Sequence, residues 1–174
     1  QETLADYGSL LLKEATHLSK LLENLLTISR ITHSKKPYVM RAVSIHEAVS
    51  EAAKRLQPQI RERAFDLICR EEGEIPNVYC DREAIINVFE NLIENAIKYS
   101  DNVREIEIWI SVASGRVSAT VKDRGKGILP EDMPHIFERF FRGRNAGLGG
   151  SGLGLAIARN IVEAHHGRIS IESV

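Results

Sequence analysis

The sequence predicts an α+β protein, in which one long helix precedes an α/β sandwich with helices on one face of an antiparallel or mixed sheet. Three observations predict it. Leucines recur every seven residues within residues 1–36, a pattern typical of a bundle or coiled-coil helix. Apolar and polar residues alternate through residues 105–113 and 116–122, as in an antiparallel hairpin. Helical stretches lie both before and after that hairpin, so helices and strands are interleaved in one domain.

The first 36 residues differ in pattern from the rest of the chain. Their heptad leucines are Leu4, Leu11, Leu18 and Leu25. A lone helix cannot bury such a stripe, so we expect a partner, either a second helix of a longer chain or another subunit. A helix folded back onto its own domain is the alternative. The polar segment that ends at Pro37 predicts a linker, which divides the chain into a helical part, residues 1–36, and one domain, residues 38–174.

The second part opens with a helix that starts at a capping box of Ser44 and Glu47. This helix runs to about Arg63, with a kink or break expected at Pro58. The further predicted elements are a short strand at 65–70, a long helix from its cap Asp81 to about Ser100, the hairpin of 105–113 and 116–122, a helix that opens at Pro130-Glu131-Asp132, a last helix at 152–165 and a final strand at 168–173.

Composition excludes several classes of protein. The 23 basic and 24 acidic residues give a net charge of −1, which argues against nucleic acid as the main partner. No apolar run is long enough to span a membrane and no signal peptide is visible, so we expect no membrane contact from this segment. Cys69 and Cys80 fit neither a disulfide scaffold nor a C-x-x-C metal site, which indicates a reducing, cytosolic setting.

Two segments carry polar groups suited to a nucleotide. In NVFENLIENAIKYS, helical spacing places Asn91, Asn95 and Lys98 on one face, where an amide oxygen could ligate Mg²⁺ and the ammonium could neutralise phosphate. A solvated polar face is the alternative. In DRGKGI, Asp123 could accept a hydrogen bond from the exocyclic amine of adenine, with Gly125 and Gly127 allowing close approach of the backbone. An ordinary turn is the alternative there.

Two further segments carry groups suited to phosphates. In HIFERFFRG and the residues after it, apolar side chains anchor a short helix while Arg139, Arg142 and Arg144 could reach phosphates; an amphipathic surface helix is the alternative. In GLGGSGLGLAI, glycines lead straight into a helix whose N-terminus could bind an anion, unless the loop is merely flexible. The alternating glycines of this segment are Gly150, Gly152 and Gly154. No Walker lysine follows them and no strand immediately precedes them, so neither of those motifs fits.

The order and spacing of the four segments resemble the N, first glycine, F and second glycine boxes of sensor histidine kinases, in the superfamily (GHKL) that includes gyrase and heat-shock chaperones. The resemblance covers residues 90–174 by motif and implies the Bergerat ATP-binding fold. It assigns Asn95 to Mg²⁺ and residues 138–151 to a lid. The residues it implies for ATP are Asn91, Asn95, Lys98, Tyr99, Asp123, Gly125, Gly127, Ile128, Arg139, Arg142, Gly150, Ser151, Gly152, Leu153 and Gly154. Residues 1–36 look like the second helix of the family's dimerisation and phosphotransfer hairpin.

The chain departs from the family's pattern in informative ways. No H-E-x-x-T-P-like segment occurs, and His17 and His33 lack the acidic residue that follows a phosphoacceptor histidine, so this fragment lacks its acceptor. Asn91 stands where gyrase-like hydrolases place a general-base glutamate, which favours phosphoryl transfer over hydrolysis. His166 replaces the first glycine of an H-G-G sequence; we expect Gly167 to end the helix in its place.

The resemblance implies an ATP:protein-histidine phosphotransferase with ATP and Mg²⁺ as cofactors. Its implied partners are a response regulator receiver domain, and a second copy of the full-length protein through the hairpin helices. The implied location is the cytoplasm, with a parent protein that is either soluble or anchored in the inner membrane. Two alternatives stay open: a serine kinase of the anti-sigma type, and a nucleotide-binding module without kinase activity.

Overall fold

The computed structural model describes residues 37–100, 102–144 and 150–173, together with Tyr7, Gly8, Leu11 and Ala15. The chain divides into two compact units, Gln1–Lys36 and Pro37–Val174. Apart from those four residues, the long helix expected in the first unit lies outside the described residues and stays a prediction. In the described part of the chain, no helix is long and apolar enough to cross a membrane.

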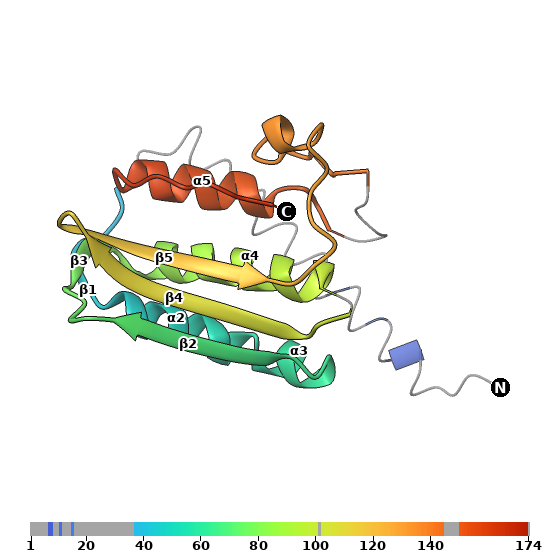
Figure 1. The fold of residues 1–174 in the computed structure, drawn as a ribbon, viewed down its shortest axis with the longest axis horizontal. Coiled ribbons are helices and arrows are strands. Elements are labelled where there is room, and N and C mark those ends of the chain that lie inside the picture. The colour runs from blue at the N-terminus through green and yellow to red at the C-terminus, as the bar shows by residue number, and fades with distance from the viewer. Residues whose placement is uncertain are drawn as a thin grey trace. The chain divides into compact units, whose positions relative to one another are not determined.

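A mixed sheet forms one layer of the second unit (Figure 1). Strand β2 (Asp66–Glu72) runs parallel to β4 (Glu105–Ala113), and β4 pairs antiparallel with β5 (Arg116–Asp123). The β4–β5 pair is the predicted hairpin. A second ladder joins β1 (Met40–Val43) antiparallel to β3 (Val78–Asp81).

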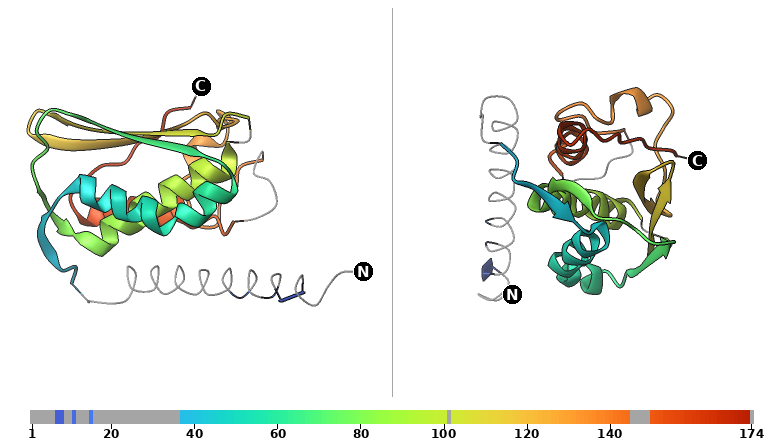
Figure 2. Two further views of the ribbon diagram at one scale, coloured as in Figure 1. Left: turned by 90° about the horizontal axis from the view of Figure 1, so that it is seen from below. Right: turned by 90° about the vertical axis from the view of Figure 1, so that its left-hand side faces the viewer.

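The described helices of the second unit all lie on one face of the three-stranded sheet (Figure 2). They are α2 (Ile45–Arg55), α3 (Gln57–Glu62), α4 (Arg82–Tyr99) and α5 (Gly154–Ala164). The largest fully buried side chains come from the inner face of β4, from β3 and from the facing helices: Ile86, Ile93, Ile106, Ile108, Ile110, Ile157, Val49 and Cys80. Alternation on the strands and helical spacing on α4 thus meet in one core, and the predicted α/β sandwich is confirmed.

The helix starts follow the predicted caps. The Ser44 Oγ accepts the Glu47 N–H at 3.3 Å, and the Asp81 Oδ1 accepts the Ala84 N–H at 3.0 Å. The break expected at Pro58 is also present, because α2 ends before Leu56 and α3 begins after it.

Asp81 joins more elements than its capping role requires. Its Oδ2 accepts the Val39 N–H at 2.8 Å, just before β1. Its own N–H donates at 3.1 Å to the Nε2 of His165, the residue that follows α5. The residue before it, Cys80, is only 1% exposed. The beginning of α4 is therefore tied to β1, β3 and the end of α5.

Three predicted elements differ in the structure. Residues 168–173 form no strand; the bond described there runs from the Ile128 N–H to the Ser173 Oγ at 2.7 Å. The helix expected from Pro130 is reduced to the 3₁₀ turn η1 (Met133–His135), where Pro134 removes a backbone donor. The last helix begins at Gly154, two residues later than expected.

The C-terminus of α5 ends in a Schellman arrangement. The His166 N–H donates to Glu163 O at 3.0 Å, and the Gly167 N–H donates to Val162 O at 2.9 Å. The left-handed residue is His166, with φ of +59°, and not the glycine after it. The expectation that Gly167 would end the helix was therefore wrong about which residue makes the turn.

Candidate functional site

The amide face of α4 lies partly inside the protein. Asn91 is only 7% exposed, and its Nδ2 donates at 2.8 Å both to the backbone oxygen and to the Oδ1 of Asn87. Asn95, one turn later, is half-buried, and no hydrogen bond with another described residue engages its side chain. Asn91 is thus fixed in position, while the Asn95 amide keeps its oxygen for a ligand.

The N-terminus of α5 rests on this face. A Cβ built on Gly154 would lie 2.8 Å from the Asn91 Oδ1, so only glycine lets the two helices approach this closely. Among the described residues, no side chain caps the start of α5. Its first backbone N–H groups and its positive dipole end therefore face the same region as the α4 amides, an arrangement suited to an anion.

The glycine turn before α5 makes two further close approaches. Gly150, with φ of +101°, lies where a Cβ would collide with the Lys98 Nζ. Gly152, with φ of +68°, lies where a Cβ would be 2.6 Å from Phe141 O, and its own oxygen accepts the Phe140 N–H at 2.9 Å. The turn is therefore bounded by Lys98 on one side and by the Phe140–Phe141 segment on the other.

Asp123, the last residue of β5, lies at the end of α4. The Asp123 Oδ1 accepts the Gly125 N–H at 2.8 Å and the Ser100 hydroxyl at 3.4 Å. Both bonds go to one oxygen, which leaves Oδ2 to accept from a ligand. A Cβ on Gly125 would lie 2.7 Å from that Oδ1 and equally close to Tyr99 O, so the loop needs glycine here. Gly127 is left-handed, with φ of +70°.

Two acidic residues, Glu131 and Asp132, hold the end of the segment that carries the predicted arginines. The buried carboxylate of Asp132 accepts the Arg144 N–H at 3.0 Å through Oδ2, and a Cβ on Gly143 would lie 2.8 Å from the same oxygen. The Arg144 guanidinium pairs with Glu131 at 2.7 Å. Arg142, which directly precedes Gly143 and Arg144, is exposed.

The structure therefore brings most of the predicted site residues together, but not all of them. Those joined by the contacts above are Asn91, Lys98, Tyr99, Asp123, Gly125, Gly150, Gly152 and Gly154. Leu153 is buried, Ser151 is half-buried and Ile128 is tied to Ser173. Arg139 is exposed, and no contact in the described part of the chain links its side chain to the other site residues.

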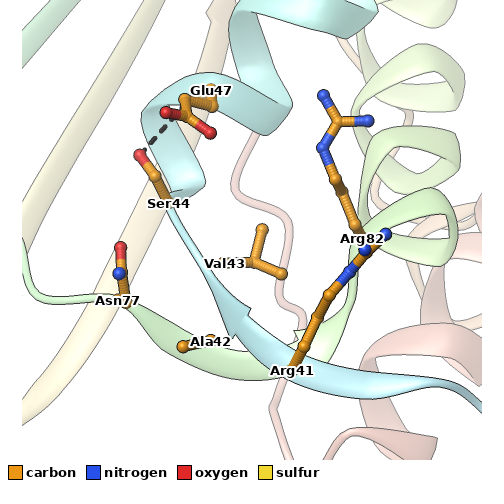
Figure 3. A pocket seen from close by; sticks show the side chains of 7 residues that line it. All are labelled: Arg41, Ala42, Val43, Ser44, Glu47, Asn77 and Arg82. Atoms are coloured by element: carbon orange, nitrogen blue, oxygen red, sulfur yellow. Dashed lines mark hydrogen bonds between the residues drawn. The ribbon is translucent and has the colours of Figure 1, made fainter.

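The hollow drawn in Figure 3 is a different place. Its volume is about 220 Å³, and its lining comes from the start of α2, from β1 and from the residues around β3: Arg41, Ala42, Val43, Ser44, Glu47, Asn77 and Arg82. The side chains of Arg41 and Arg82 lie on one side of it, opposite Ser44 and Glu47 (Figure 3). None of these was predicted to bind nucleotide.

Several supporting residues escaped the sequence interpretation. Ser100 holds Asp123, Asn87 holds Asn91, and Asp132 holds the backbone before residue 145. The role of Asn87 could have been predicted, because side chains four residues apart on a helix are neighbours and Asn87 can therefore hydrogen-bond to Asn91. The contacts of Ser100 and Asp132 join residues 23 and 12 positions apart, and no local pattern reports them.

Comparison with known proteins adds a family to this geometry. Residues 80–174 match the family described as histidine kinase-, DNA gyrase B- and HSP90-like ATPases. The sensor histidine kinase YkoH of Bacillus subtilis is 34% identical over 163 residues, which cover 92% of this chain and 35% of that protein. The sensor-like histidine kinase SenX3 of Mycobacterium tuberculosis is 32% identical, covering 99% of this chain and 42% of that protein. The chain thus spans less than half the length of these relatives.

Solved structures agree with the fold. The histidine kinase AdeS of Acinetobacter baumannii superposes with a TM-score of 0.73 at 27% identity, over 94% of this chain and 75% of that one. The histidine kinase ThkA, in complex with the response regulator protein TrrA, superposes with a TM-score of 0.72 at 27% identity, over 95% of this chain and 46% of that one. The expectation of a Bergerat-type sandwich is therefore confirmed, and the chain belongs to the histidine kinase-, DNA gyrase B- and HSP90-like ATPase family, as a catalytic ATP-binding domain of the sensor histidine kinase type.

Proposed function

We propose that this chain is the ATP-binding catalytic part of a sensor histidine kinase. It transfers the γ-phosphoryl group of ATP to a histidine on a dimerisation hairpin, from which an aspartate of a response regulator receives it. The observation that carries the proposal is the start of α5, which lacks a side-chain cap among the described residues and lies against the amide face of α4. Family membership supplies the nucleotide that such an anion site would hold.

The proposed roles follow the contacts. Lys98 and the turn of Gly150 and Gly152 hold the phosphates, since the Lys98 ammonium lies against the backbone of Gly150 in that turn. Asp123 accepts the adenine amine through its Oδ2, because its Oδ1 is already engaged by Ser100 and Gly125. Tyr99 lies between these two regions and contacts the nucleotide. Asn91 supports the phosphate site by fixing the start of α5.

The remaining predicted residues complete the proposed site. Gly154 opens α5 at the phosphates, and Gly127 and Ile128 border the base. Arg139 and Arg142 reach the phosphates from the segment after η1, where the γ-phosphoryl charge develops.

Asn95 suits the proposed Mg²⁺ ligand. Its amide oxygen is a hard donor, and an octahedral Mg²⁺ bound by one protein oxygen would complete its shell with water and phosphate oxygens. When bound, Mg²⁺ would neutralise phosphate charge that the lysine and arginines alone leave uncompensated. The chain's own contribution is then to position ATP and to stabilise its negative charge.

Phosphoryl transfer is favoured over ATP hydrolysis because Asn91 stands where gyrase-like hydrolases have a glutamate. Asn91 is a neutral amide buried against Gly154, and an amide cannot take a proton from an attacking water as a carboxylate can. A neutral imidazole attacks through the ring nitrogen that carries no proton, so no base has to deprotonate the attacking atom. The acceptor, the response regulator and the pairing with a second copy are part of the proposal, as is a cytoplasmic location, where ATP is available.

A trans-phosphorylation assay tests the proposal. The 174-residue chain is incubated with radioactive ATP and Mg²⁺, alone and with a separately supplied hairpin that carries an H-E-x-x-T-P-like acceptor segment. We expect acid-labile phosphohistidine on the hairpin and none on the chain itself, and an Asn95→Ala control should leave the hairpin unlabelled. ATP binding without transfer would favour a nucleotide-binding module, and acid-stable phosphoserine on an added protein would favour a serine kinase.

A further inference from the structure

Lys126 lies in the loop after β5, which we propose borders the adenine base. Its ammonium group, however, lies at the end of α4, near Tyr99. The Lys126 N–H donates to Tyr99 O at 3.2 Å, and the absent side chain of Gly125 lets the loop press against the same carbonyl. The Lys126 Nζ lies 5.7 Å from the centroid of the Tyr99 ring. The backbone therefore fixes where this side chain starts, and a cation–π contact accounts for where it ends.

A second ammonium group lies at the same ring. The Lys98 Nζ is 4.8 Å from the Tyr99 centroid. It is also the group that a side chain on Gly150 would strike. A continuous set of contacts thus runs from the glycine turn, through Lys98 and Tyr99, to Lys126.

The charge around Lys126 is incompletely balanced. Its side chain is exposed and takes part in no ion pair within the described residues. The Oδ1 of Asp123, at the end of β5, already accepts hydrogen bonds from the Ser100 hydroxyl and from the Gly125 N–H. Lys98 and Lys126 thus bring two positive charges to one ring. A ligand with several negative charges that reaches both ammonium groups would be attracted by each of them.

We propose that Lys126 is a further nucleotide-binding residue, which acts with Lys98 to recognise the polyphosphate of a nucleoside triphosphate. This inference rests on the proposed function. It makes Lys126 a specificity-determining residue that distinguishes nucleotides by their charge. The affinity that Lys126 adds should be largest for ATP, smaller for ADP and absent for adenosine.

The test compares Lys126→Met with a matched control, Lys122→Met. Lys122 is exposed on β5, opposite Glu107 in the β4–β5 register, and has no part in the proposed site. Affinities for ATP, ADP and adenosine are measured by calorimetry with Mg²⁺, at low and at physiological salt. We expect Lys126→Met to bind ATP about three- to tenfold more weakly, as for one solvent-accessible charge contact. The affinity for adenosine should not change. Higher salt should reduce the difference in ATP affinity between the wild-type chain and Lys126→Met, and Lys126→Arg should bind ATP as the wild-type chain does.

Three results would overturn the inference. ATP affinity equal to wild type would leave Lys126 as an ordinary surface lysine. An equal loss for ATP and adenosine would mean that Lys126 acts through the shape of the loop and not through charge. Absence of ATP binding by the wild-type chain would refute the proposed function as well, so the two failures are distinguishable. Equal melting temperatures of both variants would show that each is folded.

Discussion

Replacing Gly125 with alanine tests how the proposed adenine site is built. The added Cβ would lie 2.7 Å from the Asp123 Oδ1 and 2.7 Å from the Tyr99 carbonyl oxygen, closer than real Cβ atoms come to other atoms. The carbonyl belongs to the last residue of α4 and cannot move freely. The loop must therefore shift, and Asp123 must shift with it because its Oδ1 also accepts the Gly125 N–H.

Gly125→Ala should lower both the folding stability and the affinity for ATP. Overpacking of this kind costs about 1–3 kcal/mol of folding free energy. A displaced carboxylate also loses its bond to the adenine amine, about 1.5–3 kcal/mol, which corresponds to roughly ten- to a hundredfold weaker ATP binding. Urea denaturation measures the first quantity and calorimetric titration with ATP the second.

A control and a double mutant separate the causes. Gly115→Ala lies in the β4–β5 turn, where φ of +73° disfavours alanine but no atom lies within 4 Å of the added Cβ, so it should lower stability without changing ATP affinity. If Gly125→Ala acts by displacing Asp123, it should cost little further affinity in an Asp123→Ala background. Additive losses, or wild-type affinity in the single mutant, would refute this reasoning.

Other changes should give equally specific results. Asp123→Asn should weaken ATP binding by about 1.5–3 kcal/mol in calorimetry, and an unchanged affinity would exclude its role at the amine. Asn95→Ala should abolish Mg²⁺-dependent ATP binding; an unaltered Mg²⁺ titration would contradict the ligand assignment. His166→Gly should stabilise the chain by about 0.5–1 kcal/mol in urea, because glycine adopts the left-handed conformation without strain. The hydrogen bond from Arg55, 2.9 Å long, lowers the pKa of the Glu83 carboxyl, and both side chains are partly exposed. Glu83→Gln should therefore cost less than about 1 kcal/mol near neutral pH. That difference should disappear as pH falls below the unfolded carboxyl pKa of about 4.3 and through the lower folded value, and a difference that persists in acid would refute the pairing.

The elements predicted correctly depend on neighbours in the sequence. Ser44 and Asp81 cap helices through bonds that span three residues, and the β4–β5 hairpin closes through a tight turn. Strands β1 and β3 went unpredicted because each has four residues and their pairing joins Met40 to Asp81, far along the chain. Residues 168–173 alternate like a strand, but a strand needs a partner that the described residues do not give them.

The same distinction applies to the candidate site. Its glycines and amides were predicted because their spacing is unusual within single segments. Ser100 and Lys126 were not, because each acquires its place only when the end of α4 meets the loop after β5. Supporting residues of this kind become visible only in three dimensions.

Cys80 offers a way to follow this site from a distance. Its burial, and secondarily the charge of Asp81, raise the pKa of its thiol, so the closed protein should react slowly with alkylating reagents. With the exposed Cys69 replaced by serine, the alkylation rate would report transient separation of β3 from β1, an event that also releases the cap of α4. A nucleotide held by Lys98 at the other end of that helix would make such openings rarer. A buried thiol would then act as a kinetic probe of ligand occupancy, without a label in the site.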